Sequence, residues 1–327
     1  MLDEALRGEL VAAPAVGTGR APGHHGEILQ GVFRDSLGQP CRGLVTLPIS
    51  GLGTRAEFRP EPGAAPESLS VVPADRVKAR RAALLTLDLL RSVSILQGFG
   101  SRVCGGRLRL NGDLPVGLGM GSSTSDIIAA VRAVADSFGV RLPANTVAAL
   151  AVRAEQASDP LMLDDRALLF AQREGRVLEV LGNALPPLVV LGCLTGAGRP
   201  VNTLDLPTVD TSRISAFERL RRRLRRAVDT ADTALLGEVS TESAQLNQQL
   251  LPKEELPVLT EIARTSGAVG IQVAHSGNVA GVLFDPAAAD LPHRLERCGK
   301  ALARDGIAVT RVFRTSAARS GRDQLDV

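Results

Sequence analysis

Residues 115–126 read Pro-Val-Gly-Leu-Gly-Met-Gly-Ser-Ser-Thr-Ser-Asp, and an apolar run, residues 127–131, follows them. This stretch predicts a glycine loop that leads into the N-terminus of a helix. The first turn of a helix has backbone N–H groups without partners and carries partial positive charge. Glycines let the main chain approach an anion because they have no Cβ. Such a loop binds phosphate; the alternative is an ordinary glycine turn capped by a serine.

The spacing within the loop excludes two common nucleotide motifs. No Gly-Lys-Ser/Thr follows the glycines, as a Walker A loop requires. No Val/Ile-rich strand runs straight into the loop with an acidic residue about 20 positions later, as the dinucleotide fingerprint requires. The loop is therefore a candidate phosphate site of another type.

The composition is that of a globular enzyme. The 327 residues are enough for two compact domains, and 44% are hydrophobic and 22% charged. A net charge of +3 is too small to indicate a nucleic-acid partner by itself. The cysteines are far apart and form no Cys-x-x-Cys pair, so we expect reduced thiols and neither a disulfide framework nor a zinc site: Cys41, Cys104, Cys193 and Cys298.

Targeting and membrane segments are not expected. The chain begins Met1-Leu2-Asp3-Glu4, without the basic region and apolar core of a signal peptide. The longest apolar stretch, residues 185–194, is half of what a membrane span needs, and Pro186 and Pro187 interrupt it. We expect a cytoplasmic protein with no membrane partner.

Periodicity and turn residues predict alternating elements in the first half of the chain. Residues 41–60 predict strand, turn and strand, and residues 74–97 have a helical pattern. A strand is expected near residues 107–111, ahead of the glycine loop. The helix after the loop should end near Gly139, and another should run from Pro143 to about Gln156. Residues 167–171 and 177–181 predict a hairpin.

The second half begins after the Pro186-Pro187 break. Residues 188–194 predict a strand, followed by helices at about 212–230, 232–250 and 253–266, strands at 269–274 and 279–284, a helix at 288–303 and a strand at 307–314. This interleaving favours an open α+β sandwich, ferredoxin-like in outline. We place a domain boundary between residues 183 and 184.

A basic run at residues 217–228 favours a solvated surface more than a nucleic-acid site. It reads Phe-Glu-Arg-Leu-Arg-Arg-Arg-Leu-Arg-Arg-Ala-Val. Phe217, Leu220, Leu224 and Val228 recur at helical spacing, so one face is expected to be buried and the arginines to occupy the other. Aromatic residues for base stacking make up only 2% of the chain. We expect no nucleic-acid partner.

Two further segments accompany the glycine loop. Residues 20–31 read Arg-Ala-Pro-Gly-His-His-Gly-Glu-Ile-Leu-Gln-Gly, and residues 270–281 read Gly-Ile-Gln-Val-Ala-His-Ser-Gly-Asn-Val-Ala-Gly. Taken singly, the first is a strand entering a glycine turn and the second is two strands joined by a turn of small residues. Their order and distance along one chain carry more information than either does alone.

Together the three segments resemble the motifs of the GHMP kinases. The loop fills the pattern Pro-x-x-x-Gly-Leu/Met-Gly/Ala-Ser-Ser of this superfamily. The first segment departs from the usual Pro-Gly-Lys/Arg signature, because His24 and His25 stand there with no Lys or Arg, and Ile28 replaces the final His. Its Pro-Gly-x-x-Gly-Glu-Leu/Ile-x-Gln-Gly form, like Thr124 and Asp126 in the loop, resembles the L-threonine kinase branch, which serves cobalamin side-chain synthesis.

The resemblance implies an α+β protein with the two-domain GHMP kinase fold. An ATP-binding domain similar to ribosomal protein S5 domain 2 would occupy residues 1–183, and a ferredoxin-like domain residues 184–327. ATP and Mg²⁺ are the implied cofactors, and a hydroxy amino acid such as L-threonine is the implied acceptor. A homoserine or other secondary-metabolite kinase, a nucleotide-binding sensor with little catalysis and an RNA-binding protein remain as alternatives. The oligomeric state is unreadable, and a homodimer is left open.

The resemblance also assigns nucleotide and metal residues. ATP would be held by Pro115, Gly117, Gly119, Met120, Gly121, Ser122, Ser123 and Thr124. By its family position, Ser123 would place a hydroxyl on Mg²⁺, which prefers hard oxygen ligands. The family's metal-binding Glu falls on Glu155 or on Gln156, depending on the register, and a neutral amide would hold Mg²⁺ less well. Both assignments remain open at this point.

The acceptor side supplies the remaining candidates. Asp159 is the candidate base, because a carboxylate on the acceptor hydroxyl can take its proton as the P–O bond forms; the alternative is that it caps a turn before Pro160. Ser123 and Asp159 are thus the predicted catalytic pair. The predicted substrate-binding residues come from the first and third segments: His24, His25, Glu27, Ser276 and Gly277.

Overall fold

The computed structural model describes residues 14–96, 102–163, 166–196, 211–274 and 277–315. The strands are β1 (Gly17–Arg34), β2 (Pro40–Pro60), β3 (Ser70–Val72), β4 (Gly106–Gly112), β5 (Ala167–Ala171), β6 (Arg176–Gly182), β7 (Val189–Leu194), β8 (Gly270–Val273), β9 (Val279–Phe284) and β10 (Val309–Arg314). The helices are α1 (Val77–Leu96), α2 (Ser122–Ser137), α3 (Ala144–Glu155), α4 (Ile214–Asp229), α5 (Thr233–Asn247), α6 (Leu256–Ser266) and α7 (Leu291–Arg304), with short 3-10 turns η1 (Pro66–Ser68) and η4 (Thr211–Arg213). The predicted α+β class is confirmed, and the predicted order of elements agrees with the structure except at residues 41–60 and at β3, which was not predicted.

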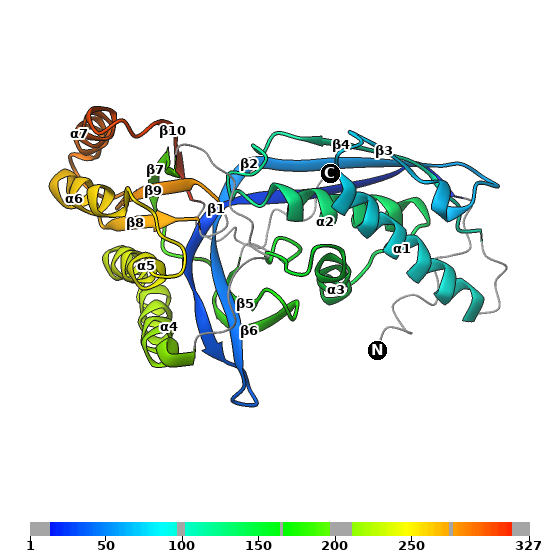
Figure 1. Ribbon diagram of the computed structural model, residues 1–327, viewed down its shortest axis with the longest axis horizontal. Helices are drawn as coiled ribbons and strands as arrows, with labels where there is room; N and C mark the ends of the chain where they lie inside the picture. The colour runs from blue at the N-terminus through cyan, green and yellow to red at the C-terminus, as the bar shows by residue number, and fades with distance from the viewer. Residues whose placement is uncertain (1–13, 97–101, 164–165, 197–210, 275–276, 316–327) are drawn as a thin grey trace.

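The strands of the described residues form one sheet that runs through both halves of the molecule. Its order is β10-β7-β9-β8-β1-β2-β4-β3, and β5 pairs with β2 and β6. Helices α1, α2 and α3 cover one end of this sheet, and α4 to α7 cover the other (Figure 1). The two ends meet where β1 pairs with β8 through Glu27 and Val273. The predicted domain boundary falls in the loop between β6 and β7 and remains a prediction, because the sheet continues past it.

The long strands β1 and β2 correct one prediction. Residues 41–60 do not reverse direction at their glycines: β2 is a single strand, antiparallel to β1 from Gly17↔Phe58 to Arg34↔Pro40. Its register shifts between the pairs Gly23↔Ile49 and Pro22↔Gly53, so residues 50–52 bulge out of the ladder. Gly51 lies in this bulge with φ 79°, a conformation that favours glycine. The glycines therefore bend the strand instead of ending it.

Helix α2 is the centre of the N-terminal half. It packs against β1 at very short range: a Cβ at Gly19 would lie 2.1 Å from the carbonyl oxygen of Ala129. α1 packs on α2, and α3 contacts both of these helices. Their apolar side chains and those of β1, β2 and β4 form one buried core. This packing holds the N-terminus of α2, and with it the glycine loop, in a fixed place beside β1.

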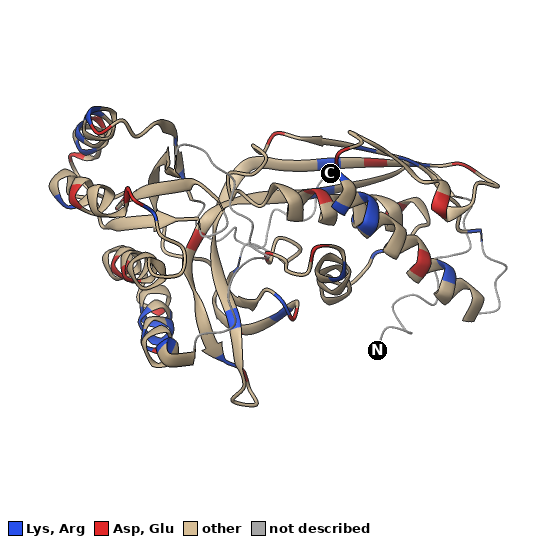
Figure 2. Ribbon diagram, viewed as in Figure 1, with Lys and Arg blue, Asp and Glu red and all other residues tan. Residues whose placement is uncertain are grey.

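The C-terminal half contains two further cores. One joins the lower parts of β1 and β2, the β5–β6 hairpin, α4 and α5; the other joins β7, β8 and β9 with α6 and α7. Three of the six arginines of α4 form ion pairs with acids: Arg221 and Arg225 both pair with Glu179 on β6, and Arg223 pairs with Glu238 and Glu242 on α5 (Figure 2). Of the apolar residues predicted to be buried in the basic run, Phe217, Leu220 and Leu224 are buried and Val228 is partly buried.

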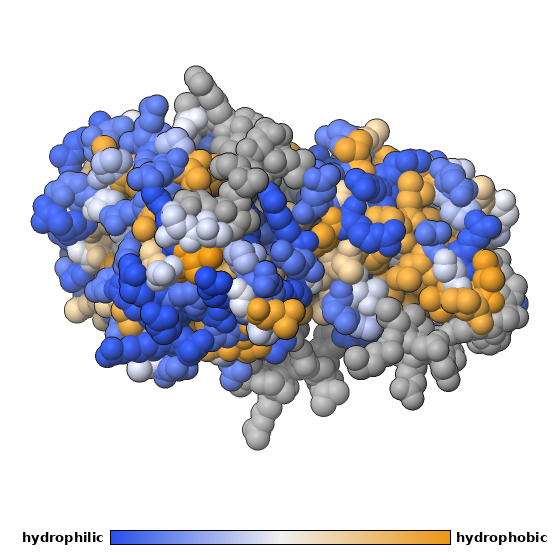
Figure 3. All heavy atoms as spheres, turned by 60° about the horizontal axis from the view of Figure 1, so that its bottom comes forward, coloured by the Kyte–Doolittle hydropathy of each residue, from blue (hydrophilic) through white to orange (hydrophobic). Residues whose placement is uncertain are grey.

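The surface differs between the two halves. In the view of Figure 3 the left half is mainly hydrophilic, and exposed apolar residues gather on the right half. The exposed apolar side chains include Val77, Ile95 and Leu96 at the ends of α1. All four cysteines are buried and free. Among the described residues, no helix is long and apolar enough to cross a membrane.

Candidate active site

The predicted glycine loop leads into α2 as expected. Gly117, Gly119 and Gly121 have φ values of 80°, 83° and 72°, so each adopts a conformation that L side chains rarely take. Gly121 is the N-cap residue of α2, and no side chain caps the helix there. Gly121 therefore supplies no side-chain oxygen to the first backbone N–H groups of α2. These N–H groups lie at the end of the helix that adjoins the glycine loop. An anion is the natural partner of such a helix end.

The turn after β8 packs directly on this loop. A Cβ on Gly119 would lie 2.8 Å from the Cα of Gly277 and 2.8 Å from the Cβ of Ala274. The N–H groups of Asn278 and Val279 both donate to the carbonyl oxygen of Leu118, at 2.9 and 3.0 Å. Small residues on both sides make this contact feasible. The conformation of the loop is thus supported from the C-terminal half of the chain.

A cavity of about 570 Å³ opens beside the loop. Its wall comes from the loop and the start of α2, the N-terminal end of α1, the end of α3, strands β1 and β2, and the β5–β6 turn. The lining side chains with polar or charged groups are Glu27, Gln30, Asp75, Arg76, Lys78, Ser122, Ser123, Thr124, Asp126, Glu155, Gln156, Ser158, Asp159, Gln172 and Arg173. The cavity is large enough for the phosphate groups of a nucleotide together with a small second molecule.

Glu155, at the end of α3, contacts the first turn of α2. The Ser123 hydroxyl donates to Glu155 Oε2 at 2.8 Å, and the Thr124 hydroxyl donates to Oε1 at 2.7 Å. The Lys78 ammonium lies 3.4 Å from Glu155 Oε2. Burial raises the pKa of the Glu155 carboxyl, although Thr124, Lys78 and Ser123 oppose this effect. The carboxylate is therefore held in a dry place where a cation would stabilise its charged form.

Gln156, the other candidate for this position, does not meet Ser123. It is the C-cap residue of α3, with φ 69°, and its side chain is exposed. Its backbone N–H donates to the carbonyl oxygen of Val152. Of the two registers that the sequence left open, the geometry favours the one with Glu155.

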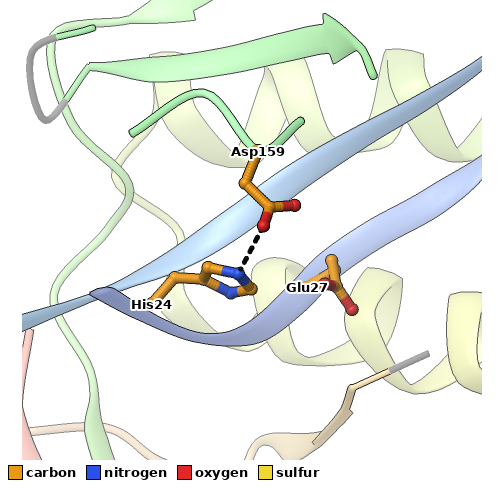
Figure 4. A group of neighbouring side chains, drawn as sticks. All are labelled: His24, Glu27 and Asp159. Carbon is orange, nitrogen blue, oxygen red and sulfur yellow. Dashed lines mark hydrogen bonds and ion pairs between the residues drawn. The ribbon is translucent and has the colours of Figure 1, made fainter. Parts of the chain in front are cut away.

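Asp159 forms an ion pair with His24, which the sequence did not predict. His24 Nε2 lies 3.1 Å from Asp159 Oδ2, and His24 Nδ1 lies 3.1 Å from the carbonyl oxygen of Gly26 (Figure 4). Both partners are acceptors, so both ring nitrogens must carry protons and the ring must be an imidazolium. Burial disfavours this charge, but the charge and hydrogen bond of Asp159 outweigh it and raise the pKa of His24 to about 9.

The same pair keeps Asp159 ionised. Burial opposes ionisation of its carboxyl, but the charge and hydrogen bond of His24 and a hydrogen bond from Thr124 outweigh burial and lower the pKa of Asp159. The Thr124 hydroxyl lies 3.2 Å from Asp159 Oδ2 and 2.7 Å from Glu155 Oε1, so it links the two carboxylates. The carboxylate of Asp159 remains partly accessible, with 21% of its side chain exposed.

A bulge in β1 brings His24 and Glu27 to the same place. In a regular strand two residues three positions apart face opposite sides of the sheet. Here His24 pairs with Pro48 and Glu27 with Thr46, so β1 carries one residue more than β2 between these pairs. Gly26 allows this bulge with φ 67°. Ligand atoms of His24, Glu27 and Asp159 all lie within 4.8 Å of one another (Figure 4).

Five predicted residues do not line the cavity; one of them, His24, reaches it only through its hydrogen bond to Asp159. His25 is turned away from it: its Nδ1 lies 3.0 Å from Gln272 Oε1, its ring lies 5.0 Å from that of Phe313, and burial lowers its pKa to about 4. Met120 packs in a small apolar cluster, and Gly277 supports Gly119. Pro115 is exposed before the loop and is absent from the wall. Ser276 lies outside the described residues.

Several wall residues were not predicted as site residues. These residues are Arg76 just before α1, Lys78 in α1, Gln30 in β1, and Gln172 and Arg173 in the β5–β6 turn. They carry no motif, since only the folding of distant segments brings them together. Asp126, used above only as part of the loop pattern, bonds Thr54 Oγ1 at 2.6 Å and Arg76 Nε at 3.0 Å. These contacts tie α1, α2 and β2 together at the cavity edge.

Comparison with known proteins identifies the class. Residues 82–167, from α1 to the start of β5, match the family model described as the GHMP kinases N terminal domain. A solved homoserine kinase from Cytophaga hutchinsonii superimposes with a TM-score of 0.62 at 17% identity, over 95% of this chain and 97% of that one. The fold is therefore that of the two-domain GHMP kinases.

Part of the N-terminal half is thus similar in sequence to the GHMP kinases, and the chain is similar to them in fold. Among curated relatives, it is 28% identical over 184 residues to an L-threonine kinase of Citrobacter freundii, a match that covers 55% of this chain and 62% of that protein. It is 30% identical over 174 residues to a 4-diphosphocytidyl-2-C-methyl-D-erythritol kinase of Methylorubrum extorquens, covering 53% of this chain and 55% of the relative. The matches thus span less than two thirds of either relative.

Proposed function

We propose that the chain is an ATP- and Mg²⁺-dependent kinase that phosphorylates the side-chain hydroxyl of L-threonine or a related hydroxy amino acid. One observation carries the proposal: a continuous chain of hydrogen bonds runs from Ser123 through Glu155, Thr124 and Asp159 to His24, beside the uncapped end of α2. This chain of hydrogen bonds supports a cation site made of oxygen ligands, next to an ionised carboxylate and beside the loop proposed to bind phosphate.

The phosphates of ATP would be bound by the loop. Backbone N–H groups at the start of α2 point toward an anion placed at Gly119 and Gly121, and the helix dipole favours the negative charge. Ser122 adds a hydroxyl to the cavity wall, and Lys78 adds a cation from α1. Phosphoryl transfer depends mainly on such positioning and charge neutralisation.

Mg²⁺ fits the oxygens of Ser123 and Glu155. These two groups already share a hydrogen bond of 2.8 Å, and hard oxygen donors of this kind are the ligands that Mg²⁺ prefers. Glu155 is held by three donors, so its carboxylate has a fixed orientation. When bound, the ion would neutralise charge on the phosphates.

Asp159 would act on the acceptor hydroxyl. An ionised carboxylate that accepts a hydrogen bond from the hydroxyl aligns it and takes its proton as the new P–O bond forms. A base with a lowered pKa takes this proton late, when the hydroxyl oxygen has become acidic through bonding to phosphorus. His24 would hold Asp159 in this orientation, because its imidazolium is itself fixed by Gly26.

The acceptor class rests on the relatives and on the motifs. The L-threonine kinase of Citrobacter freundii is one of the curated relatives, and the first segment and the loop resemble that branch. A homoserine or other secondary-metabolite kinase is the second candidate, favoured by the homoserine kinase among the structural neighbours. A weakly catalytic sensor is less well supported, since Glu155 and not Gln156 meets Ser123. The paired arginines of α4 argue against the RNA-binding alternative.

An ATP-consumption assay over a panel of acceptors tests the proposal. Purified protein with Mg·ATP would receive L-threonine, L-serine, L-homoserine and no acceptor, in parallel with the variants Asp159→Asn and Ser123→Ala. Acceptor-dependent ADP formation that both variants lose supports a kinase. ADP formation that no acceptor stimulates, with ATP still bound, would instead favour the sensor.

A further inference from the structure

One part of the cavity wall has the composition of an acceptor site. It comes from β1, β2 and the β5–β6 turn, away from the phosphate loop and α1. We call it the acceptor wall; its residues are Glu27, Gln30, Leu44, Gln172 and Arg173. It offers one carboxylate, two amides, one guanidinium and a single aliphatic side chain. A long apolar acceptor would need more apolar surface, and a multiply charged anion would need more cations.

Gln30 lines this wall and also a smaller neighbouring cavity, and one of its polar atoms is unsatisfied. Its side chain is 8% exposed, and within the described part of the chain its Oε1 has no hydrogen-bond partner. A buried acceptor without a donor costs roughly 1–3 kcal/mol. The backbone N–H of Gln30 already donates to the Ser243 hydroxyl at 3.1 Å. The unsatisfied atom is therefore the oxygen of the side-chain amide. A donor brought by a ligand would remove this cost.

Glu27 lies three residues before Gln30 on β1, lines the same cavity and lies close to Asp159. Its side chain is buried, with 4% of the residue exposed, and a carboxylate oxygen lies within 4.8 Å of one from Asp159. Two carboxylates this close can each accept from a donor if the two donors sit on neighbouring carbon atoms. Asp159 is the group proposed above for the hydroxyl, so the donor at Glu27 belongs on the adjacent carbon. An ammonium group is the donor that a buried carboxylate binds most strongly.

The charges around the wall favour a ligand without net charge. The His24 imidazolium balances Asp159. Lys253 is buried near Glu27 and Glu255: burial lowers its pKa, and both carboxylates oppose this change. Its ammonium donates to the carbonyl oxygen of Gly277. The Lys253 ammonium is already a countercharge near Glu27. A zwitterion adds no net charge to this region, whereas a free amine or a dianion would.

Arg173 offers a positive charge for the carboxylate of a zwitterion. Its side chain is exposed at the mouth of the cavity, and it forms no ion pair or side-chain hydrogen bond with any residue that the structure describes. A guanidinium in that state can receive a carboxylate with two parallel hydrogen bonds.

We propose that the acceptor wall selects α-amino-β-hydroxy acids, with the ammonium bound by Glu27 and Gln30, the hydroxyl by Asp159 and the carboxylate by Arg173. The inference rests on the proposed kinase function and makes it more specific. It assigns Glu27 and Gln30 to substrate selection and not to phosphoryl transfer. L-homoserine, whose hydroxyl is one carbon further from the ammonium, should fit less well than L-threonine.

The test compares L-threonine with (R)-3-hydroxybutanoate, which is threonine without its ammonium group. We expect wild-type kcat/KM to be about 10³-fold or more higher for threonine. Hydroxybutanoate brings no ammonium donor, so the buried polar groups that would bind the ammonium stay unpaired. Glu27→Gln should lower kcat/KM for threonine about 100-fold, mostly through KM, and leave that for hydroxybutanoate nearly unchanged. Equal losses for both acceptors, or a wild-type enzyme that does not distinguish them, would overturn the inference.

Two controls separate this inference from the proposed function. Glu67→Gln makes the same change at an exposed glutamate in η1 that does not line the cavity, and should leave both acceptors unaffected. If phosphoryl transfer occurs only with acceptors that lack an ammonium group, the kinase proposal holds and the inference fails. If no acceptor is phosphorylated, the kinase proposal fails, and calorimetric titration decides the inference: threonine-selective binding that Glu27→Gln abolishes supports it, and its absence overturns it.

Discussion

His24 Nε2 lies 3.1 Å from Asp159 Oδ2, although 134 residues separate the two positions in the sequence. Nothing in the sequence around either residue predicts this contact. The opposite ring nitrogen lies 3.1 Å from the Gly26 carbonyl oxygen, so the histidine is charged and cannot rotate without losing a partner. The GHMP kinases usually carry Lys or Arg in this segment. In this chain the histidine provides the positive charge beside the carboxylate.

Removing the charge of Asp159 should abolish most of the activity. Asp159→Asn keeps the size of the side chain but cannot accept the hydroxyl proton, and we expect kcat to fall about 10²–10⁴-fold. ATP binding should change little, because Asp159 is not among the groups proposed for the phosphates. Steady-state kinetics and nucleotide titration measure the two effects. Asp88→Asn on the outer face of α1 is the matched control, and an unchanged kcat in Asp159→Asn would refute the assigned role.

The His24 ion pair predicts how stability and activity depend on pH. The pKa of His24 is raised from 6.5 to about 9, so its stabilising contribution is complete below pH 6.5 and is lost as the pH rises through about 9. The difference in unfolding free energy between wild type and His24→Asn should therefore shrink over this range. Denaturant titrations at several pH values measure it. A difference that stays constant to pH 10 would show that the ring is neutral in the folded protein.

Activity should follow the same protonation. Wild-type kcat/KM should decline as the pH passes about 9, when Asp159 loses its charged partner. His24→Lys should retain more activity than His24→Asn at pH 9.5, because an ammonium remains charged there. If the two variants are equally impaired at every pH, the histidine has a role in packing alone.

Glu155 should control the requirement for Mg²⁺ and lower stability when the ion is absent. Burial raises the pKa of its carboxyl, so the ionised form costs free energy that grows as the pH rises above 4.5. Glu155→Gln should therefore unfold at a higher temperature than wild type at pH 8 without Mg²⁺, and need about tenfold more Mg²⁺ for half-maximal activity. Thermal melts and Mg²⁺ titrations measure these effects. A less stable variant with an unaltered Mg²⁺ requirement would contradict both assignments.

The contact between the loop and the β8–β9 turn makes Gly119 intolerant of a side chain. Gly119→Ala would bring a Cβ to 2.8 Å from Gly277 and Ala274 at a φ of 83°. Gly38 is a matched control, since its φ is 77° but nothing lies within 4 Å of its Cβ position. Gly38→Ala should cost roughly 1–2 kcal/mol from the backbone conformation alone. Gly119→Ala should cost more and also weaken ATP binding; equal costs in denaturant titrations would show that the contact is loose.

The fold could be predicted from the sequence because its elements have strong local signals. The helical spacing of residues 74–97, the glycines around α2 and the proline before α3 located the N-terminal helices to within a few residues. The error at residues 41–60 has a physical origin. A glycine pair marks a place where the backbone departs from a regular strand, but a bulge and a turn use the same residue types.

The candidate site was only partly predictable. The loop amides, Ser123, Thr124 and Asp159 are local features of two motifs, and they line the cavity. The difference between His24 and His25 depends on the bulge at Gly26, which turns one ring toward Asp159 and leaves the other with Gln272. The choice between Glu155 and Gln156 depends on which residue ends α3. Neither geometry is encoded by residue spacing along one segment.

The central claim is that this chain transfers the γ-phosphoryl group of ATP to the hydroxyl of L-threonine. Mass spectrometry of L-threonine incubated with the wild-type protein and Mg·ATP tests it most directly, with Asp159→Asn and Ser123→Ala beside it. We expect a product heavier than threonine by one HPO₃ group, formed in proportion to ADP and lost in both variants. Unmodified threonine in the presence of a phosphorylated different acceptor, or of bound but unreacted ATP, would contradict the claim.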